Sequence, residues 1–310
     1  MKVIFMGTPE FAVGALRSIW EAGHEVCAVV TQPDKAKGRS GQLQMSPVKE
    51  FALEKGIPVL QPVRIKRPEE VERLREFGAD IFVVAAFGQI LSQEILDLPR
   101  YGCVNIHASL LPRYRGAAPI QWAILNGEDV TGVTIMQMDA GLDTGDMLFK
   151  REVEIEDTDT SASLHDKLAK AGADLILPAL DAIEKGTVHP EKQQDGESCY
   201  ASMIDKSMGE IDFSRPVLEI WRQVRGLNPW PSAYTSYKGK TLKIWEASPS
   251  GDEEDGRPGS ISRVDKDAVY INTGRGVLRV TQLQLEGKKR MQVKDFLLGC
   301  RMEKGEMLGC

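Results

Sequence analysis

Short apolar runs and longer amphipathic stretches alternate along the first part of the chain. The apolar runs predict buried strands at residues 3–6, 25–31, 59–60 and 81–86. Helical spacing of the apolar residues predicts helices at 11–22, 47–55 and 68–77. Strands that alternate with helices are typical of a parallel, doubly wound α/β sheet of the Rossmann-like kind.

The next apolar strand carries two polar side chains at its end. Asn105 and His107 stand two positions apart, so in a strand they leave the same face while Ile106 turns into the core. Ligands bind at the carboxyl ends of the strands in open α/β sheets. The pattern therefore indicates a functional edge of the sheet at these residues.

The middle of the chain continues the same pattern. Helical spacing marks residues 118–126 and 161–185, and apolar runs predict strands at 132–138 and 147–153. Between the two strands, residues 139–146 read Asp-Ala-Gly-Leu-Asp-Thr-Gly-Asp. The glycines allow this connection to bend sharply.

The C-terminal part has a different pattern. Residues 189–208 are polar and without periodicity, so we expect one domain at 1–189, a linker at 190–207 and a second domain at 208–310. After a helix at 216–227, short strands are predicted at 234–237, 241–247, 259–264, 268–272 and 276–285. Five short strands in succession favour a small β-barrel of the oligonucleotide-binding (OB-like) type. A chain of 310 residues is long enough for two cores.

Charge is unevenly distributed between these parts. The net charge is −6, but the chain from Lys206 onward has 18 Lys and Arg against 14 Asp and Glu, which leaves 21 against 31 before it. The difference is either chance variation or the mark of an acidic enzyme with a C-terminal module that tolerates a polyanion.

Composition also limits the other classes. Five cysteines without Cys-x-x-Cys spacing, and four scattered histidines, predict neither a disulfide framework nor a metal site. No apolar run approaches the roughly 20 residues that span a bilayer, and the first turn comes too early for a signal peptide. We expect a cytoplasmic monomer with no membrane contact and no obligate protein partner.

The polar residues at the sheet edge suit acyl transfer to an amine. Such a reaction needs a donor for a developing oxyanion and a group that removes a proton. Asn105 can donate an amide hydrogen bond, His107 can donate or relay a proton, and Asp143 can orient the imidazole. Because no nucleophilic Ser or Cys accompanies them in a strand-to-helix elbow, direct attack by the amine is favoured over an acyl-enzyme. Spacing alone leaves a purely structural role equally open.

The first βα turn and the connection after the second predicted strand also bear on function. The first βα turn lacks Gly-x-Gly-x-x-Gly, so a nicotinamide dehydrogenase is the weaker interpretation. Residues 32–47 form a long connection that includes Lys35, Lys37 and Arg39. These cations either grip phosphates or belong to a solvated loop, and composition does not decide between the two.

The motifs at residues 105–122, Asn-Ile-His-Ala-Ser-Leu-Leu-Pro-Arg-Tyr-Arg-Gly-Ala-Ala-Pro-Ile-Gln-Trp, and at 138–146 closely resemble the formyltransferases that use 10-formyltetrahydrofolate. Phe-Met-Gly-Thr-Pro-Glu-Phe at the start, Lys206-Ser-Met-Gly-Glu-Ile-Asp-Phe and Leu227-Asn-Pro-Trp-Pro are similar to the members that act on methionyl-tRNA. The resemblance covers nearly the whole chain. Purine-pathway members share the Asn, His and Asp but lack the C-terminal module.

The resemblance implies a Rossmann-like formyltransferase domain, an OB-like tRNA-binding domain, 10-formyltetrahydrofolate as cosubstrate, initiator Met-tRNA as partner and no metal. The family's catalytic residues fall on Asn105, His107 and Asp143. Its folate contacts fall on the stretch Ser109, Leu110, Leu111 and Pro112. Its tRNA-responsive loop falls on 32–47, with contacts from Lys35, Lys37 and Arg39.

In one place the sequence departs from the family. Members often have another lysine or two where Ser40, Gly41 and Gln42 stand, which weakens the expectation of a strongly cationic loop. Two rival interpretations stay open. A formyltransferase that acts on an amino sugar would need no polyanion contacts, and a noncatalytic RNA-binding protein would show no folate-dependent turnover.

Overall fold

The computed structural model of the chain describes residues 1–37 and 42–309. Two compact units make up the molecule, and each draws on several stretches of sequence. The first unit comprises Met1–Pro119, Val130–Glu154 and His165–Ala201, and the second comprises Ile120–Asp129, Ile155–Leu164 and Ser202–Cys310. Residues 190–201, which we expected to belong to a linker, thus group with the first unit. The predicted boundaries at 189 and 207 stay a proposal.

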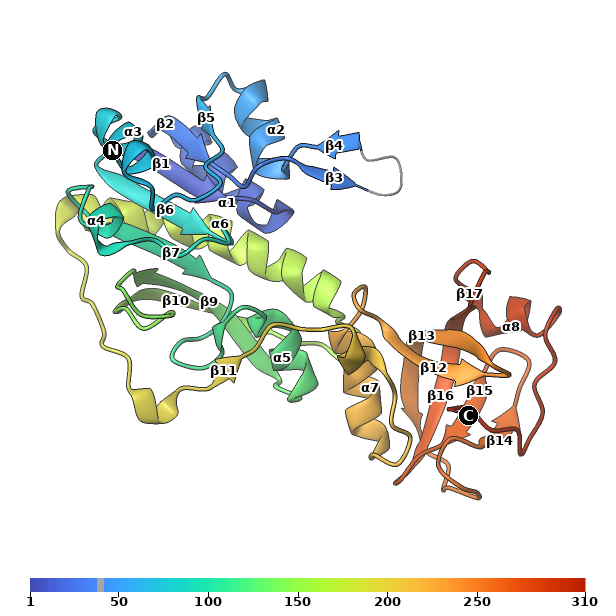
Figure 1. Cartoon of the computed structure of the whole chain (residues 1–310). Helices are drawn as coiled ribbons and strands as arrows, with labels where there is room; N and C mark the ends of the chain where they lie inside the picture. The colour runs from blue at the N-terminus through green and yellow to red at the C-terminus, as the bar shows by residue number, and fades with distance from the viewer. Residues whose placement is uncertain (38–41, 310) are drawn as a thin grey trace. The chain divides into compact units, whose positions relative to one another are not determined.

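A seven-stranded sheet forms the centre of the first unit, in the order β10-β9-β7-β6-β1-β2-β5 (Figure 1). Its parallel strands are β1 (Lys2–Gly7), β2 (Glu25–Val30), β5 (Val59–Leu60), β6 (Ile81–Ala85) and β7 (Cys103–His107). The other two strands are β9 (Val130–Gln137), which pairs antiparallel with β7, and β10 (Met147–Glu154), which pairs antiparallel with β9. The predicted α/β class is confirmed. Five neighbouring strands of the sheet are parallel, and the two strands beyond β7 make the sheet mixed.

Helices cover both faces of this sheet. On one face, α3 (Pro68–Glu76) and α4 (Gln93–Leu96) contribute to a core with side chains of β1, β2, β6 and β7. On the other face lie α1 (Glu10–Glu21), which contacts α2 (Pro47–Glu54), and α6 (Ser161–Lys185). Gly172 of α6 is so close to Ile106 that an added Cβ would lie 2.8 Å from its Cγ2. This contact places Ile106 on the face of β7 that α6 covers.

Several short elements lie at the carboxyl edge of the sheet. A hairpin of β3 (Lys35–Lys37) and β4 (Gln42–Gln44) interrupts the connection that we expected to be a loop (Figure 1). β8 (Arg115–Gly116) pairs in parallel with β11 (Tyr200–Ala201). The short helix η1 (Asp195–Glu197) belongs to the first unit, whereas α5 (Pro119–Leu125) after its first residue and η2 (Ser207–Gly209) belong to the second. Such two- and three-residue strands carry no apolar alternation, so the sequence did not predict them.

An antiparallel sheet forms the centre of the second unit, in the order β12-β13-β16-β15-β14, with β17 paired to β16. The strands are β12 (Ala233–Tyr237), β13 (Lys240–Ser250), β14 (Ile261–Val264), β15 (Val269–Asn272), β16 (Val277–Leu285) and β17 (Met291–Gln292). The helices are α7 (Val217–Gly226) and α8 (Val293–Phe296). All five predicted strands form, and they pair in one antiparallel sheet.

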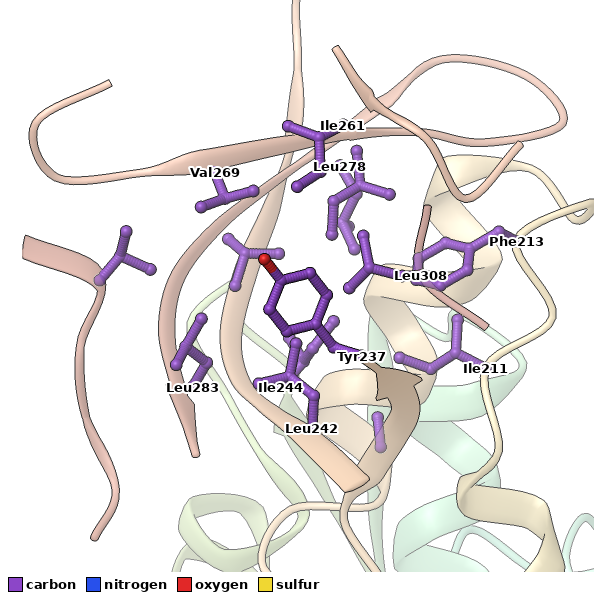
Figure 2. Packing of buried hydrophobic residues seen from close by; sticks show 14 of the residues in the cluster. Ile211, Phe213, Tyr237, Leu242, Ile244, Ile261, Val269, Leu278, Leu283 and Leu308 are labelled. Atoms are coloured by element: carbon purple, nitrogen blue, oxygen red, sulfur yellow. The ribbon is translucent and has the colours of Figure 1, made fainter. Parts of the chain in front are cut away.

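The core of the second unit surrounds one aromatic ring. Figure 2 shows Tyr237 enclosed by aliphatic side chains of the strands and by Leu308 near the end of the chain. Its hydroxyl donates to Glu306 Oε2 over 2.6 Å. Burial, together with this hydrogen bond, raises the pKa of the Tyr237 hydroxyl. A buried polar group is thus paired within the core, as stability requires.

Candidate active site

β7 brings two of the predicted site residues to the carboxyl edge of the sheet. Ile106 turns toward α6, so Asn105 and His107 lie on the opposite face, as predicted. His107 is buried and Asn105 is half-buried. The carboxamide of Asn105 forms no hydrogen bond with any other residue in the part of the chain that the structure describes. Asn105 therefore has donor and acceptor groups that remain available to a ligand.

The imidazole of His107 is oriented by a main-chain carbonyl. Nε2 lies 2.9 Å from the carbonyl oxygen of Tyr114, and Nδ1 lies 3.7 Å from Asp143 Oδ2. Because a carbonyl can only accept, Nε2 carries a hydrogen and donates it. Nδ1 is consequently the ring atom that faces Asp143, and it is a donor only when the ring is protonated.

Asp143 reaches the site from the connection between β9 and β10. Its backbone has φ +52°, in the left-handed region that non-glycine residues seldom adopt. Its Oδ2 accepts a hydrogen bond of 2.9 Å from the amide of Gly116 in β8. The structure thus brings His107 and Asp143 together, although 36 positions separate them in sequence.

The stretch predicted to contact a folate is largely buried. Ser109 is fully buried, and its hydroxyl donates to the carbonyl of Arg113 over 2.6 Å. Leu111 packs in a cluster with methionines of β9 and β10, and its amide donates to Thr134 Oγ1. Pro112 is buried too, so Leu110 is the one member of the four with exposed side-chain surface. A ligand at this stretch would meet mainly the main chain and Leu110.

The predicted tRNA contacts lie on the β3/β4 hairpin. The side chain of Lys35 is exposed, β3 ends at Lys37, and Arg39 lies outside the described residues. At the base of the hairpin, Lys49 Nζ lies 2.6 Å from Asp34 Oδ2. Hydrogen bonds from Lys49 and Gln61 lower the pKa of the Asp34 carboxyl. No hydrogen bond or ion pair found among the described residues joins this hairpin to His107 or Asp143.

Sequence reasoning missed a glutamine that contacts the Asp143 connection. Gln193 Nε2 donates to the main-chain carbonyls of Asp143 and Gly145, over 2.8 and 2.7 Å. We call residues 191–201, which contain Gln193, the brace segment. Tyr114 and Gly116, the other partners of the site, stand inside the motif at 105–122, whereas no sequence signal distinguishes Gln193 from its polar neighbours.

A metal site and a membrane-spanning helix are both absent from the part of the chain that the structure describes. Within residues 1–37 and 42–309, no three His, Cys, Asp or Glu side chains gather in a way that could hold a metal ion. Likewise, among the helices of the described chain there is none with the length and apolar character needed to cross a membrane.

Comparisons with known proteins agree with this arrangement. The family model described as formyl transferase matches residues 1–180, and the model described as formyl transferase, C-terminal domain, matches residues 203–301. The chain is 54% identical to a protein named methionyl-tRNA formyltransferase from Agathobacter rectalis over 305 residues, which are 98% of each chain. It is 53% identical to a protein of the same name from Geobacter metallireducens, over 100% of this chain and 99% of the relative.

A solved structure is similar in fold. The N-formyltransferase from Helicobacter canadensis, in complex with folinic acid and dTDP-3-aminofucose, superposes with a TM-score of 0.70. The alignment covers 94% of this chain and 100% of that one, at 22% identity.

Proposed function

The chain belongs to the formyl transferase family, and we propose that it transfers the formyl group of 10-formyltetrahydrofolate to the α-amino group of methionyl initiator tRNA. The names of the relatives at about half identity over the full chain support this acceptor. The observation that carries the proposal is the site itself. The unpaired amide of Asn105 shares a strand face with His107, whose Nδ1 faces Asp143.

Asn105 is proposed to stabilise the negative charge that develops on the formyl oxygen. Its amide has no competing partner among the described residues, so donating to a substrate breaks no existing hydrogen bond. A preorganised donor of this kind stabilises an oxyanion more strongly than water does, because it needs no reorientation. Asn105 thus lowers the barrier to attack without contributing to the fold.

His107 and Asp143 are proposed to handle the proton. The hydrogen bond to Tyr114 keeps a proton on Nε2, so the second proton enters and leaves at Nδ1, 3.7 Å from Asp143 Oδ2. In the protonated ring, Nδ1–H is a donor for the developing oxyanion. Through water, Asp143 can accept the proton that the attacking amine releases. When the tetrahedral intermediate collapses, the bond between the formyl carbon and N10 of the folate breaks, and this proton passes back through water to N10 of the departing tetrahydrofolate.

The formyl donor is proposed to lie against residues 109–112. The folate supplies an activated formyl group, and the chain has only to bind and orient it. The folinic acid in the Helicobacter canadensis enzyme supports a folate at this kind of site. The buried side chains of Ser109 and Leu111 hold the main chain of the stretch in place, which fits recognition of a pterin through backbone groups.

The acceptor is proposed to contact the hairpin and the C-terminal unit. Lys35, Lys37 and Arg39 would meet phosphates, and the excess of basic residues from Lys206 onward fits a polyanionic partner. Phosphate contacts make binding weaken as salt rises. Arg39→Ala should therefore impair use of tRNA while stability and folate binding are unchanged.

The decisive experiment measures transfer of labelled formyl from 10-formyltetrahydrofolate. Three acceptors are compared: initiator Met-tRNA, elongator Met-tRNA and a dTDP-amino sugar. Transfer that is selective for initiator Met-tRNA is the expected result. Transfer only to the sugar would keep the chemistry and replace the acceptor, and binding of tRNA without any transfer would leave a noncatalytic RNA-binding protein.

A further inference from the structure

We propose that Gln193 is a positioning residue that holds Asp143 in place for the transfer step. This inference rests on the proposed function, since it assigns a role in the same site. Gln193 does not touch His107 or Asn105 in the structure. It acts through the main chain of the connection that carries Asp143.

The amide of Gln193 is fully used in three hydrogen bonds. Both hydrogens of Nε2 go to carbonyl oxygens, of Asp143 over 2.8 Å and of Gly145 over 2.7 Å. Oε1 accepts from Arg115 Nε over 2.9 Å. A carboxamide is the side-chain group that combines two donors with an acceptor in one plane, so these partners select glutamine at this position.

Asp143 needs such support because its backbone is strained. A non-glycine residue at φ +52° lies above its preferred conformations by an energy that the surroundings must offset. The neighbouring Gly145 lies so close to the end of β9 that a Cβ there would be 1.7 Å from the carbonyl oxygen of Gln137. The connection therefore has to be held in one tight conformation, and Gln193 binds it on both sides of Thr144.

The same glutamine also fixes the partner of the Asp143 carboxylate. Arg115, which Gln193 binds, precedes Gly116, whose amide donates to Asp143 Oδ2. Asp143 is thus held twice, at its carboxylate by β8 and at its carbonyl by Gln193. Since Gln193 contacts both the connection and β8, it sets the position of the carboxylate relative to His107.

The brace segment is itself well anchored. Glu191 exchanges two main-chain hydrogen bonds with Met147 at the start of β10, over 2.8 and 2.9 Å. Asp195 accepts from Arg115 over 2.9 Å, and the carbonyl of Cys199 accepts from the amide of Arg115 at the same distance. Gln193 is therefore presented from a fixed backbone and not from a free chain, which a positioning role requires.

The test compares Gln193→Met with Gln194→Met. Methionine keeps the length of glutamine and removes its donors and acceptor. Gln194 is an exposed neighbour whose side chain makes no hydrogen bond to another described residue, so it is a matched control. We expect the single-turnover transfer rate of Gln193→Met to fall on the order of 10- to 100-fold, because small misplacements of catalytic groups cost this much. In the control Gln194→Met, the folate affinity, the Tm and the transfer rate should all match those of wild type.

A double-mutant cycle separates positioning from general support. If Gln193 acts through Asp143, the variant Asp143→Asn/Gln193→Met is no slower than Asp143→Asn alone. Independent, multiplying losses would overturn the inference. So would a Gln193→Met variant that transfers formyl as fast as the Gln194→Met control.

A measurement without turnover distinguishes failure of this inference from failure of the proposed function. The amide of Gly116 donates to Asp143 Oδ2, so hydrogen exchange at Gly116 reports the position of the carboxylate. Exchange there should be faster in Gln193→Met than in wild type and in the control. This result would uphold the positioning role even if wild type formylated no acceptor, whereas unchanged exchange would refute it.

Discussion

The two units differ in whether a notable polar side chain is hydrogen-bonded within the protein. In the second unit, the hydroxyl of Tyr237 is buried and paired with Glu306, which in turn accepts from Lys238 over 2.8 Å. In the first unit, Asn105 is half-buried on the same strand face as His107, and its amide is unpaired among the described residues. Pairing stabilises a fold, because an unsatisfied buried group costs free energy. An amide that is left without a partner at a sheet edge instead indicates where a ligand will bind.

The sharpest way to test this difference is to remove the unpaired amide. We expect Asn105→Ala to lower turnover by about 10²- to 10³-fold, the usual loss on removal of an oxyanion donor. Its Tm should match that of wild type, because no hydrogen bond in the described structure is lost. Single-turnover transfer and thermal unfolding measure both. Near-normal turnover would remove Asn105 from the mechanism.

The charge facing His107 can be removed without changing the size of the side chain. In Asp143→Asn we expect about 10²-fold slower transfer, at the lower end for loss of acid–base assistance. Transfer should rise with pH as the substrate amine loses its proton, near the value of about 7.7 to 8.0 for model α-amino groups.

Asp143→Asn should slow transfer without changing the shape of this pH profile. The rise belongs to the substrate and should not move. A rate profile from pH 6 to 10 for both proteins, with chemistry shown to be rate-limiting, checks this. A rise whose midpoint shifts in Asp143→Asn would contradict the assignment of the rise to the substrate amine.

Removal of the paired hydroxyl in the second unit should lower stability and leave turnover unchanged. Tyr237→Phe removes the hydrogen bond to Glu306 and should destabilise the second unit by about 1 kcal/mol. Such a change lowers Tm by about 2 to 4 °C. Formyl transfer at 25 °C should be unaffected. A loss of transfer without a loss of stability would contradict the contrast between the two regions.

The smallest expected effect concerns two cysteines of the first unit. Burial raises the pKa of the Cys103 thiol to about 12, whereas Cys199 in the brace segment is exposed. Because the thiolate is the reactive form, a brief treatment of native protein with iodoacetamide should modify Cys199 and spare Cys103. Peptide mapping before and after unfolding measures this. Modification of native Cys103 would show that the packing of α4 against β7 opens readily.

The sequence predicted the elements that are held by apolar packing. β7 was found because Val104 and Ile106 mark a buried strand, and its alternation correctly placed Asn105 and His107 on one face. The antiparallel strands of the second unit were found for the same reason. Periodicity reports which side chains face a core, and these elements depend on little else.

The parts that escaped prediction are held by hydrogen bonds between distant residues. The bond from Gln193 to Asp143 spans 50 positions and leaves no periodic signal. The resemblance could assign Ser109 to a folate contact, but only the structure shows that its hydroxyl is committed to the carbonyl of Arg113. The roles of these residues, and of Lys35, Lys37 and Arg39, stay predictions until the variants are measured.

The place of the brace segment also bears on how such enzymes could acquire new acceptors. Ala201 is the last residue of the first unit, and Ser202 continues into the second. A recombination event at residue 190 would carry Gln193 away with the incoming module, although Asn105, His107 and Asp143 would all be inherited. A crossover after Ala201 would keep every described contact of the brace segment with the connection and β8. The seam at which the C-terminal part could be exchanged without loss of these contacts therefore lies at the end of the brace segment, and not at the start of the polar stretch.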